Sequence, residues 1–139
     1  MRQLISVLVA AALVVAAGCT EDNPTRPSPG AVPIVESFSG SVAPGSSAFY
    51  SFTVPTEGRV DLTLIELSDG GGPAATIVGL GIGAPLGIGC TAGVSVSTGP
   101  GVTPQFSQTL TPGVYCVKVS DTGQLVNAVT FVLNITRPR

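Results

Sequence analysis

The sequence contains neither histidine nor tryptophan, and only 10% of its 139 residues are charged. Without histidine the chain lacks the commonest general base, the usual imidazole ligand of zinc, and the Ser-His and Cys-His pairs of nucleophilic enzymes. With only two tyrosines it is also poor in the exposed aromatic side chains that many sugar-binding proteins use. These absences favour a non-catalytic protein.

Charged side chains are few and dispersed. Six basic residues stand against eight acidic ones, and no run of Lys or Arg forms a basic patch, so nucleic acid is not an expected partner. The acidic residues from position 34 onward are Glu36, Glu57, Asp61, Glu66, Asp69 and Asp121. Because the Asp-x-Asp-x-Asp spacing of a calcium loop is missing, we expect neither a metal ion nor a cofactor.

The N-terminal segment has the form of an export signal. Arg2 precedes an apolar stretch, residues 4–17, in which Ser6 is the only polar side chain, and the stretch ends at Gly18 and Cys19. A short charged region, a short apolar region and small residues at the end are typical of a cleaved signal peptide. The apolar stretch is short for a membrane-spanning helix.

Residues 15–19, Val-Ala-Ala-Gly-Cys, resemble the lipobox of bacterial lipoprotein signal peptides. The resemblance implies that residues 1–18 form a signal helix that is removed, and that Cys19 receives a diacylglyceryl group on its thiol and a fatty acid such as palmitate on its amine. Two or three acyl chains, at ~0.8 kcal/mol per buried CH₂, would make a lasting membrane anchor. Ala16 stands where lipoboxes most often carry Leu.

The residue after the cysteine bears on localisation. In the family's sorting logic an Asp at that position favours the inner membrane, and Thr20 stands there instead. The resemblance therefore implies a lipid-anchored protein of the bacterial envelope, at the outer membrane. Two alternatives stay open, an ordinary secretory signal cut near Ala17 or Gly18 and a retained transmembrane helix.

Residues 19–33 are expected to form a tether. Residues 20–33 contain four prolines in a polar context, which favours an extended, semi-rigid chain. At ~3.1 Å per residue this segment would hold the following domain roughly 40 Å from the lipid surface.

Residues 34–139 are predicted to form one all-β domain. Gly, Pro, Ser, Thr and Val are abundant, and apolar residues alternate with polar ones in short runs between turn residues. The expected strands are residues 34–41, 46–54, 59–67, 75–82, 94–97, 106–110, 114–120 and 125–136. Half-buried strands need a second sheet to cover their apolar faces, so we predict a jelly-roll-like antiparallel sandwich of two sheets and seven to nine strands.

Several of these segments resemble the bacterial pre-peptidase C-terminal domain, a small β-sandwich of secreted and surface proteins. They are Phe-Ser-Gly-Ser-Val at 38–42, Ala-Phe-Tyr-Ser-Phe-Thr-Val at 48–54, Gly-Arg-Val-Asp-Leu-Thr-Leu at 58–64, Leu-Thr-Pro-Gly-Val-Tyr-Cys-Val-Lys-Val at 110–119 and Val-Thr-Phe-Val-Leu-Asn-Ile at 129–135. Members of that family usually accompany a protease or another hydrolase domain, and the resemblance implies an accessory role in secretion or substrate binding. These 139 residues show no sign of such a catalytic domain.

The other two cysteines are most simply a disulfide, because a pair in an exported domain is normally oxidised. Cys116 shares its predicted strand face with Lys118, which places the bridge on the outer side of a sheet. There it would join the Gly-rich segment around Cys90 to the strand that begins near Gly113, and would stabilise the fold by roughly 3.5 kcal/mol. Two free thiols or a redox pair are the alternatives.

Two further patterns could suggest a phosphate-binding site or a catalytic site, but neither fits its motif. The glycines of residues 79–87 match no phosphate-binding motif and are expected to form a strand and a close-packed loop. Asp61 and Glu66 are expected on opposite faces of one strand, which argues against a pair of glycosidase carboxylates.

The sequence thus favours an envelope lipoprotein whose β-sandwich is a non-catalytic binding or accessory module, with a protein or glycan partner that the sequence does not identify. A secreted hydrolase-accessory or carbohydrate-binding module, or an unrecognised hydrolase, is the alternative.

Overall fold

A computed structural model describes residues 32–139. The predicted signal peptide, Cys19 and nearly all of the tether lie outside the described residues. The described part contains eight strands: β1 (Ile34–Val42), β2 (Ser47–Val54), β3 (Gly58–Ser68), β4 (Val78–Leu86), β5 (Gly89–Thr98), β6 (Phe106–Leu110), β7 (Gly113–Asp121) and β8 (Val129–Arg137). Residues 32–139 include no helix, and so none that could span a membrane.

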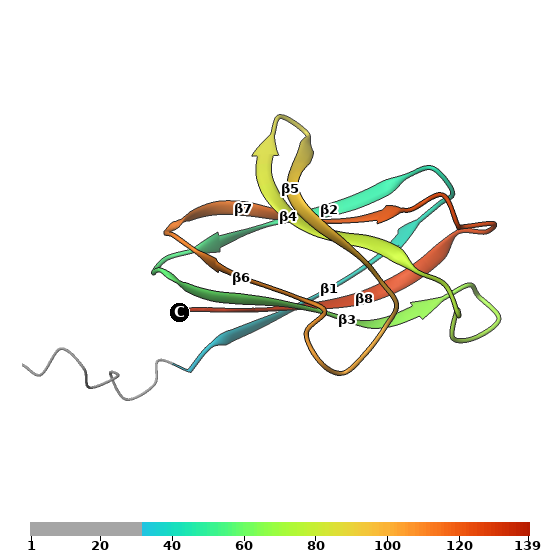
Figure 1. The fold of residues 1–139 in the computed structure, drawn as a ribbon, viewed down its shortest axis with the longest axis horizontal. Helices are drawn as coiled ribbons and strands as arrows, with labels where there is room; N and C mark the ends of the chain where they lie inside the picture. Colours follow the sequence, from blue (N-terminus) through green and yellow to red (C-terminus); the bar gives the residue numbers. More distant parts are fainter. Residues whose placement is uncertain (1–31) are drawn as a thin grey trace, which may run out of the picture.

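The eight strands form two antiparallel sheets of four, which confirms the predicted all-β sandwich. One sheet has the order β1-β8-β3-β6 and the other the order β2-β7-β4-β5. Figure 1 shows the two layers one above the other, with β2, β7 and β4 in the upper layer and β1, β3 and β8 in the lower one. The chain crosses between the layers at most of its connections, so each sheet combines strands that are distant in sequence.

One core fills the space between the sheets. In β8, every second residue from Val129 to Ile135 is buried, and Leu133 at its centre is completely so. β7 opposes it with Val117 and Val119, which are likewise fully buried. This alternation is the period-two pattern on which the sandwich was predicted, because successive side chains of a strand point to opposite faces.

Two tyrosines use their hydroxyl groups to fix backbone at the margins of this core. Tyr50 packs against Phe38 and donates a hydrogen bond of 2.6 Å to the carbonyl oxygen of Ser39. Tyr115 donates one of 3.0 Å to the carbonyl oxygen of Thr111, four residues earlier. Because a hydroxyl that loses water needs another partner, these bonds offset part of the cost of packing the two half-buried rings against the core.

The expected placement of Asp61 and Glu66 on opposite faces is wrong. The pairing of β3 with β8 shifts between Leu64 and Glu66, and both Ile65 and Glu66 are exposed. This bulge adds one residue and returns Glu66 to the outer face that also holds Asp61. Because Ile65 is the extra residue of the bulge, Asp61 and Glu66 are four ladder steps apart, which is roughly 13 Å along the strand at about 3.3 Å per step. That separation exceeds the ~5–9.5 Å of glycosidase carboxylate pairs.

Three strands differ from the sequence prediction by three or more residues at one end or both. β4 begins and ends later than expected, and β5 is ten residues long rather than a short strand at 94–97. The Gly-rich segment therefore pairs as a long hairpin, because the ladder between β4 and β5 continues to Leu86 and Gly89. β8 begins at Val129 rather than near residue 125, because residues 122–128 form the loop that joins β7 to β8.

Candidate functional site

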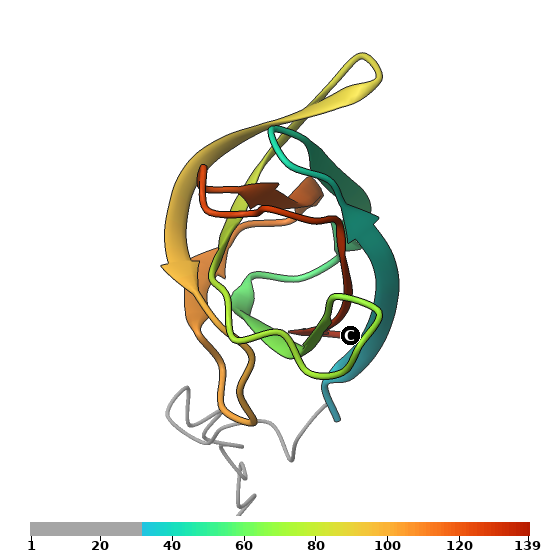
Figure 2. The ribbon, with the colours of Figure 1, turned by 90° about the vertical axis from the view of Figure 1, so that its right-hand side faces the viewer.

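The hairpin formed by β4 and β5 projects from the body of the molecule. Its inner half belongs to the upper sheet, whereas its outer half leaves that layer and points away from the sandwich (Figures 1 and 2). The register of the pair shifts between Ile82 and Gly83, at the point where the hairpin departs. We call residues 84–91, the outer half of the hairpin, the finger.

Glycines on the outer face of β4 make this departure possible. Gly81 pairs with Lys118 and Gly83 pairs with Cys116 on β7, so both glycines face outward. A Cβ atom at Gly83 would lie 1.8 Å from the carbonyl oxygen of Thr91, and one at Gly81 would lie 2.6 Å from that of Val94. Only residues without a side chain allow the β5 backbone to approach so closely, so the glycines expected in a close-packed loop shape a bent hairpin instead.

A disulfide between Cys90 and Cys116 fixes the base of the finger, as predicted. It joins the beginning of β5 to the middle of β7 with a Cα–Cα distance of 5.8 Å. Cys116 shares the outer face of the sheet with Lys118, yet its side chain is completely buried. β5 lies close to β7 and β2 as well as to β4, so the bent hairpin covers the bridge.

The tip of the finger exposes apolar residues only. Residues 84–88, Ala-Pro-Leu-Gly-Ile, are all exposed; Leu86 is 73% and Ile88 98% accessible. Leu86 pairs with Gly89, which leaves Gly87 and Ile88 as a two-residue turn, and Gly87 has a φ of 58°. A positive φ at the first turn position is the backbone conformation that tight hairpins require.

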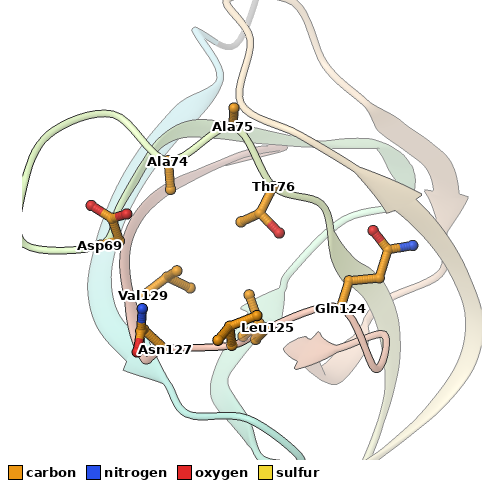
Figure 3. A pocket seen from close by; sticks show the side chains of 9 residues that line it. Asp69, Ala74, Ala75, Thr76, Gln124, Leu125, Asn127 and Val129 are labelled. Atoms are coloured by element: carbon orange, nitrogen blue, oxygen red, sulfur yellow. The ribbon is translucent and has the colours of Figure 1, made fainter.

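A second feature is a hollow at one end of the sandwich, between the β3–β4 and β7–β8 loops (Figure 3). Its volume is about 280 Å³. Polar side chains at its rim are Asp69, Thr76, Gln124 and Asn127, and apolar ones are Ala74, Leu125 and Val129. Such a rim could hydrogen-bond a small polar group over an aliphatic floor. Within residues 32–139, no three metal-ligating side chains of Asp, Glu or Cys gather there or elsewhere.

Asp121 orders one wall of this hollow. Its Oδ2 accepts a hydrogen bond from the backbone N–H of Gly45 at 2.8 Å, and its Oδ1 accepts those of Gly123, Gln124 and Leu125 at 2.8, 3.0 and 3.1 Å. These bonds, led by the one from Gly45, hold the pKa of Asp121 below its ordinary value of 3.8 because they favour the carboxylate. The charge therefore connects the β1–β2 and β7–β8 loops.

Charge is distributed unevenly between the two sheets. No charged residue occurs between Asp69 and Lys118 in the sequence, and this stretch includes the entire β4–β5 hairpin. On the other sheet, Arg137 pairs with Glu36 and Arg59 pairs with Asp61, whose Oδ1 also accepts a hydrogen bond from Ser107. The charged groups on strands thus concentrate on the face opposite the finger.

Of the site residues predicted from the sequence, the structure brings together Cys90 and Cys116, whereas Cys19 lies outside residues 32–139. Sequence reasoning missed the finger. A signal for it existed in the long uncharged stretch that begins after Asp69, which could have indicated a neutral surface. A scan of protein-family models and a search of the curated proteins found no match to this chain.

Proposed function

We propose that this chain is a lipoprotein of the bacterial envelope, anchored through an acylated Cys19, whose β-sandwich is a non-catalytic binding or accessory module. The observation that carries the binding role is the finger. Folded proteins seldom keep adjacent large apolar side chains in water on a rigid projection, and those that do commonly use them for contact. Leu86 and Ile88 occupy such a projection.

The anchoring role is supported by the lipobox-like residues 15–19 and by the proline-rich segment that follows. An anchored module needs a spacer and a contact surface. The tether would supply the first and the finger the second. The sandwich itself, cross-linked by its disulfide, supplies a rigid support, because rigid elements position a contact surface more precisely than loops do.

Mass spectrometry of the protein isolated from the envelope of a bacterial host tests the anchor. We expect a mature chain that begins at Cys19 and carries a diacylglyceryl group with or without an N-acyl chain. The matched control is Cys19→Ala, which should accumulate with residues 1–18 still attached. A mature chain with a free amine at any other residue would contradict the anchor.

A further inference from the structure

We infer that the finger enters the surface of a lipid bilayer, with Leu86 and Ile88 as the inserting side chains. The inference deepens the proposed function by naming the partner of the binding module, and it rests on that function only for the anchor that would keep the module near lipid.

The composition of the finger fits a bilayer. Residues 84–88 include no polar side chain, and the nearest charged residue on the sheet that bears the finger is Lys118 on β7. Moving a charged or hydrogen-bonding side chain into the apolar layer is costly, and this tip carries none. The tip therefore enters without leaving a polar side chain unsatisfied, and Thr91, the only hydroxyl-bearing residue of the finger, lies at its base opposite Ala84.

The backbone of the finger sets the depth of insertion. Pairing between β4 and β5 continues to Leu86 and Gly89, but within residues 32–139 neither strand has a second neighbour beyond Gly83, so the N–H and C=O groups on the two outer edges of the finger have no partner strand there. Open sheet edges do not occur in the hydrocarbon core of a bilayer, so we place the finger at the headgroup boundary, where water can bond these groups while Leu86 and Ile88 reach the acyl chains.

The size of the tip favours lipid over a folded protein. A stable protein interface buries about 800 Å² on each partner. Two large side chains at the end of a narrow hairpin fall well short of that area. They suffice for shallow and reversible insertion, which becomes stable when a second attachment holds the molecule at the membrane.

The support of the finger determines its direction. The Cys90–Cys116 disulfide and the close backbone contact at Gly83 keep it projecting from the sheet. The beginning of β1 lies on the opposite side of the sandwich (Figures 1 and 2). The expected tether of roughly 40 Å exceeds the ~10 Å between the two sheets and leaves about 30 Å for the outer side chains and the finger, so the anchor and the finger would reach the same bilayer.

Because the chain has no tryptophan, a single introduced one reports its surroundings without background. We would purify full chains carrying Ile88→Trp or Val102→Trp and mix them with phosphatidylcholine vesicles that contain a spin-labelled quencher lipid. Val102 is a matched control, since it is 93% exposed and lies in the β5–β6 loop on the side away from the finger (Figures 1 and 2).

We expect the emission of Ile88→Trp to move to shorter wavelength and to be quenched, and that of Val102→Trp to stay unchanged. Adding Leu86→Asp to Ile88→Trp should weaken the response at least tenfold, because a carboxylate is strongly disfavoured in the apolar layer. Circular dichroism and an intact disulfide would show that each variant is folded.

Equal or greater quenching of Val102→Trp would overturn the inference, because that loop and the finger face opposite ways. So would an absence of quenching for both reporters on vesicle-bound protein, which would indicate a protein partner for the finger. Mass spectrometry of the N-terminus separates these results from failure of the anchor. If Cys19 is not acylated, excess vesicles are added to the unanchored chain, and an unchanged Ile88→Trp spectrum then refutes insertion.

Discussion

At the scale of single residues, Asp121 does the most to connect separate parts of the molecule. One carboxylate accepts backbone N–H groups from both the β1–β2 and the β7–β8 loops. Hydrogen bonds to an ionised acceptor are stronger than neutral ones, and removing the acceptor leaves several donors without a partner. Sequence reasoning treated Asp121 only as one of several scattered acidic residues, because all of its partners are backbone N–H groups, which every residue except proline carries.

Asp121→Asn should lower the melting temperature at pH 7, since an amide can accept fewer of these bonds and carries no charge. The pKa of Asp121 is lower in the folded protein than in the unfolded chain. The carboxylate therefore stabilises the fold fully at pH values above 3.8, and this stabilisation is lost as the pH falls through the lower pKa of the folded protein. In thermal scans followed by circular dichroism, the difference in melting temperature between wild type and Asp121→Asn should therefore become smaller below about pH 4. A difference that stays constant down to pH 2 would contradict this assignment.

At the scale of elements, the β4–β5 hairpin shows how residues of different kinds build one structure. Glycines on the outer face of β4 permit the bend, Gly87 permits the turn, and the disulfide fixes the base. Glycine costs conformational entropy on folding, and a covalent cross-link offsets part of that cost by restricting the unfolded chain. The finger can therefore remain rigid although its sequence is rich in glycine.

Replacing both bridge cysteines, Cys90→Ala with Cys116→Ala, should destabilise the protein by roughly 3.5 kcal/mol on the chain-entropy model for a loop of 26 residues. Denaturant unfolding followed by circular dichroism measures this. Reduced wild type is the control, because it lacks the bridge but keeps both sulfur atoms, which the double variant loses. Equal stability of the oxidised protein and the double variant would mean that the bridge contributes nothing.

Gly83→Ala should destabilise the hairpin by about 1–3 kcal/mol or more, because the new methyl group would overlap the carbonyl oxygen of Thr91. Gly89→Ala on the same hairpin is the matched control, since a Cβ there would meet only the carbonyl oxygen of Leu86, at 3.6 Å. Hydrogen exchange of residues in β4 and β5 locates the effect. A Gly83→Ala protein with unchanged exchange would refute the close approach.

At the scale of the whole molecule, both sheets share one continuous core. Buried residues from β2, β4 and β7 pack with those from β3 and β8 in a single cluster. Neither sheet could keep its apolar face out of water alone, so the described part of the chain should fold and unfold as one unit.

Leu133→Ala should therefore destabilise the entire sandwich by about 2–5 kcal/mol, because it leaves a cavity at a completely buried position. Val126→Ala, at a residue that is 88% exposed, should change stability by no more than about 0.5 kcal/mol. Circular dichroism and tyrosine fluorescence should report coincident unfolding transitions in every case. Separate transitions would show that the two sheets unfold independently.

The sequence by itself determined the fold class and the disulfide. Alternation along β8 and around Tyr115 requires half-buried strands. In a β-rich chain that is expected to be exported, a disulfide is the simplest use of the two remaining cysteines. Period-two patterns and pairing rules are local, so they can be recognised without coordinates.

Only the tertiary structure decided where the finger points, why Cys116 is buried on an outer face, and that Glu66 shares a face with Asp61. The direction of the finger and the burial of Cys116 depend on the close approach of the β5 backbone to Gly83. The position of Glu66 depends on the bulge at Ile65. These contacts are set by pairing between strands, and no periodicity within a single strand encodes them.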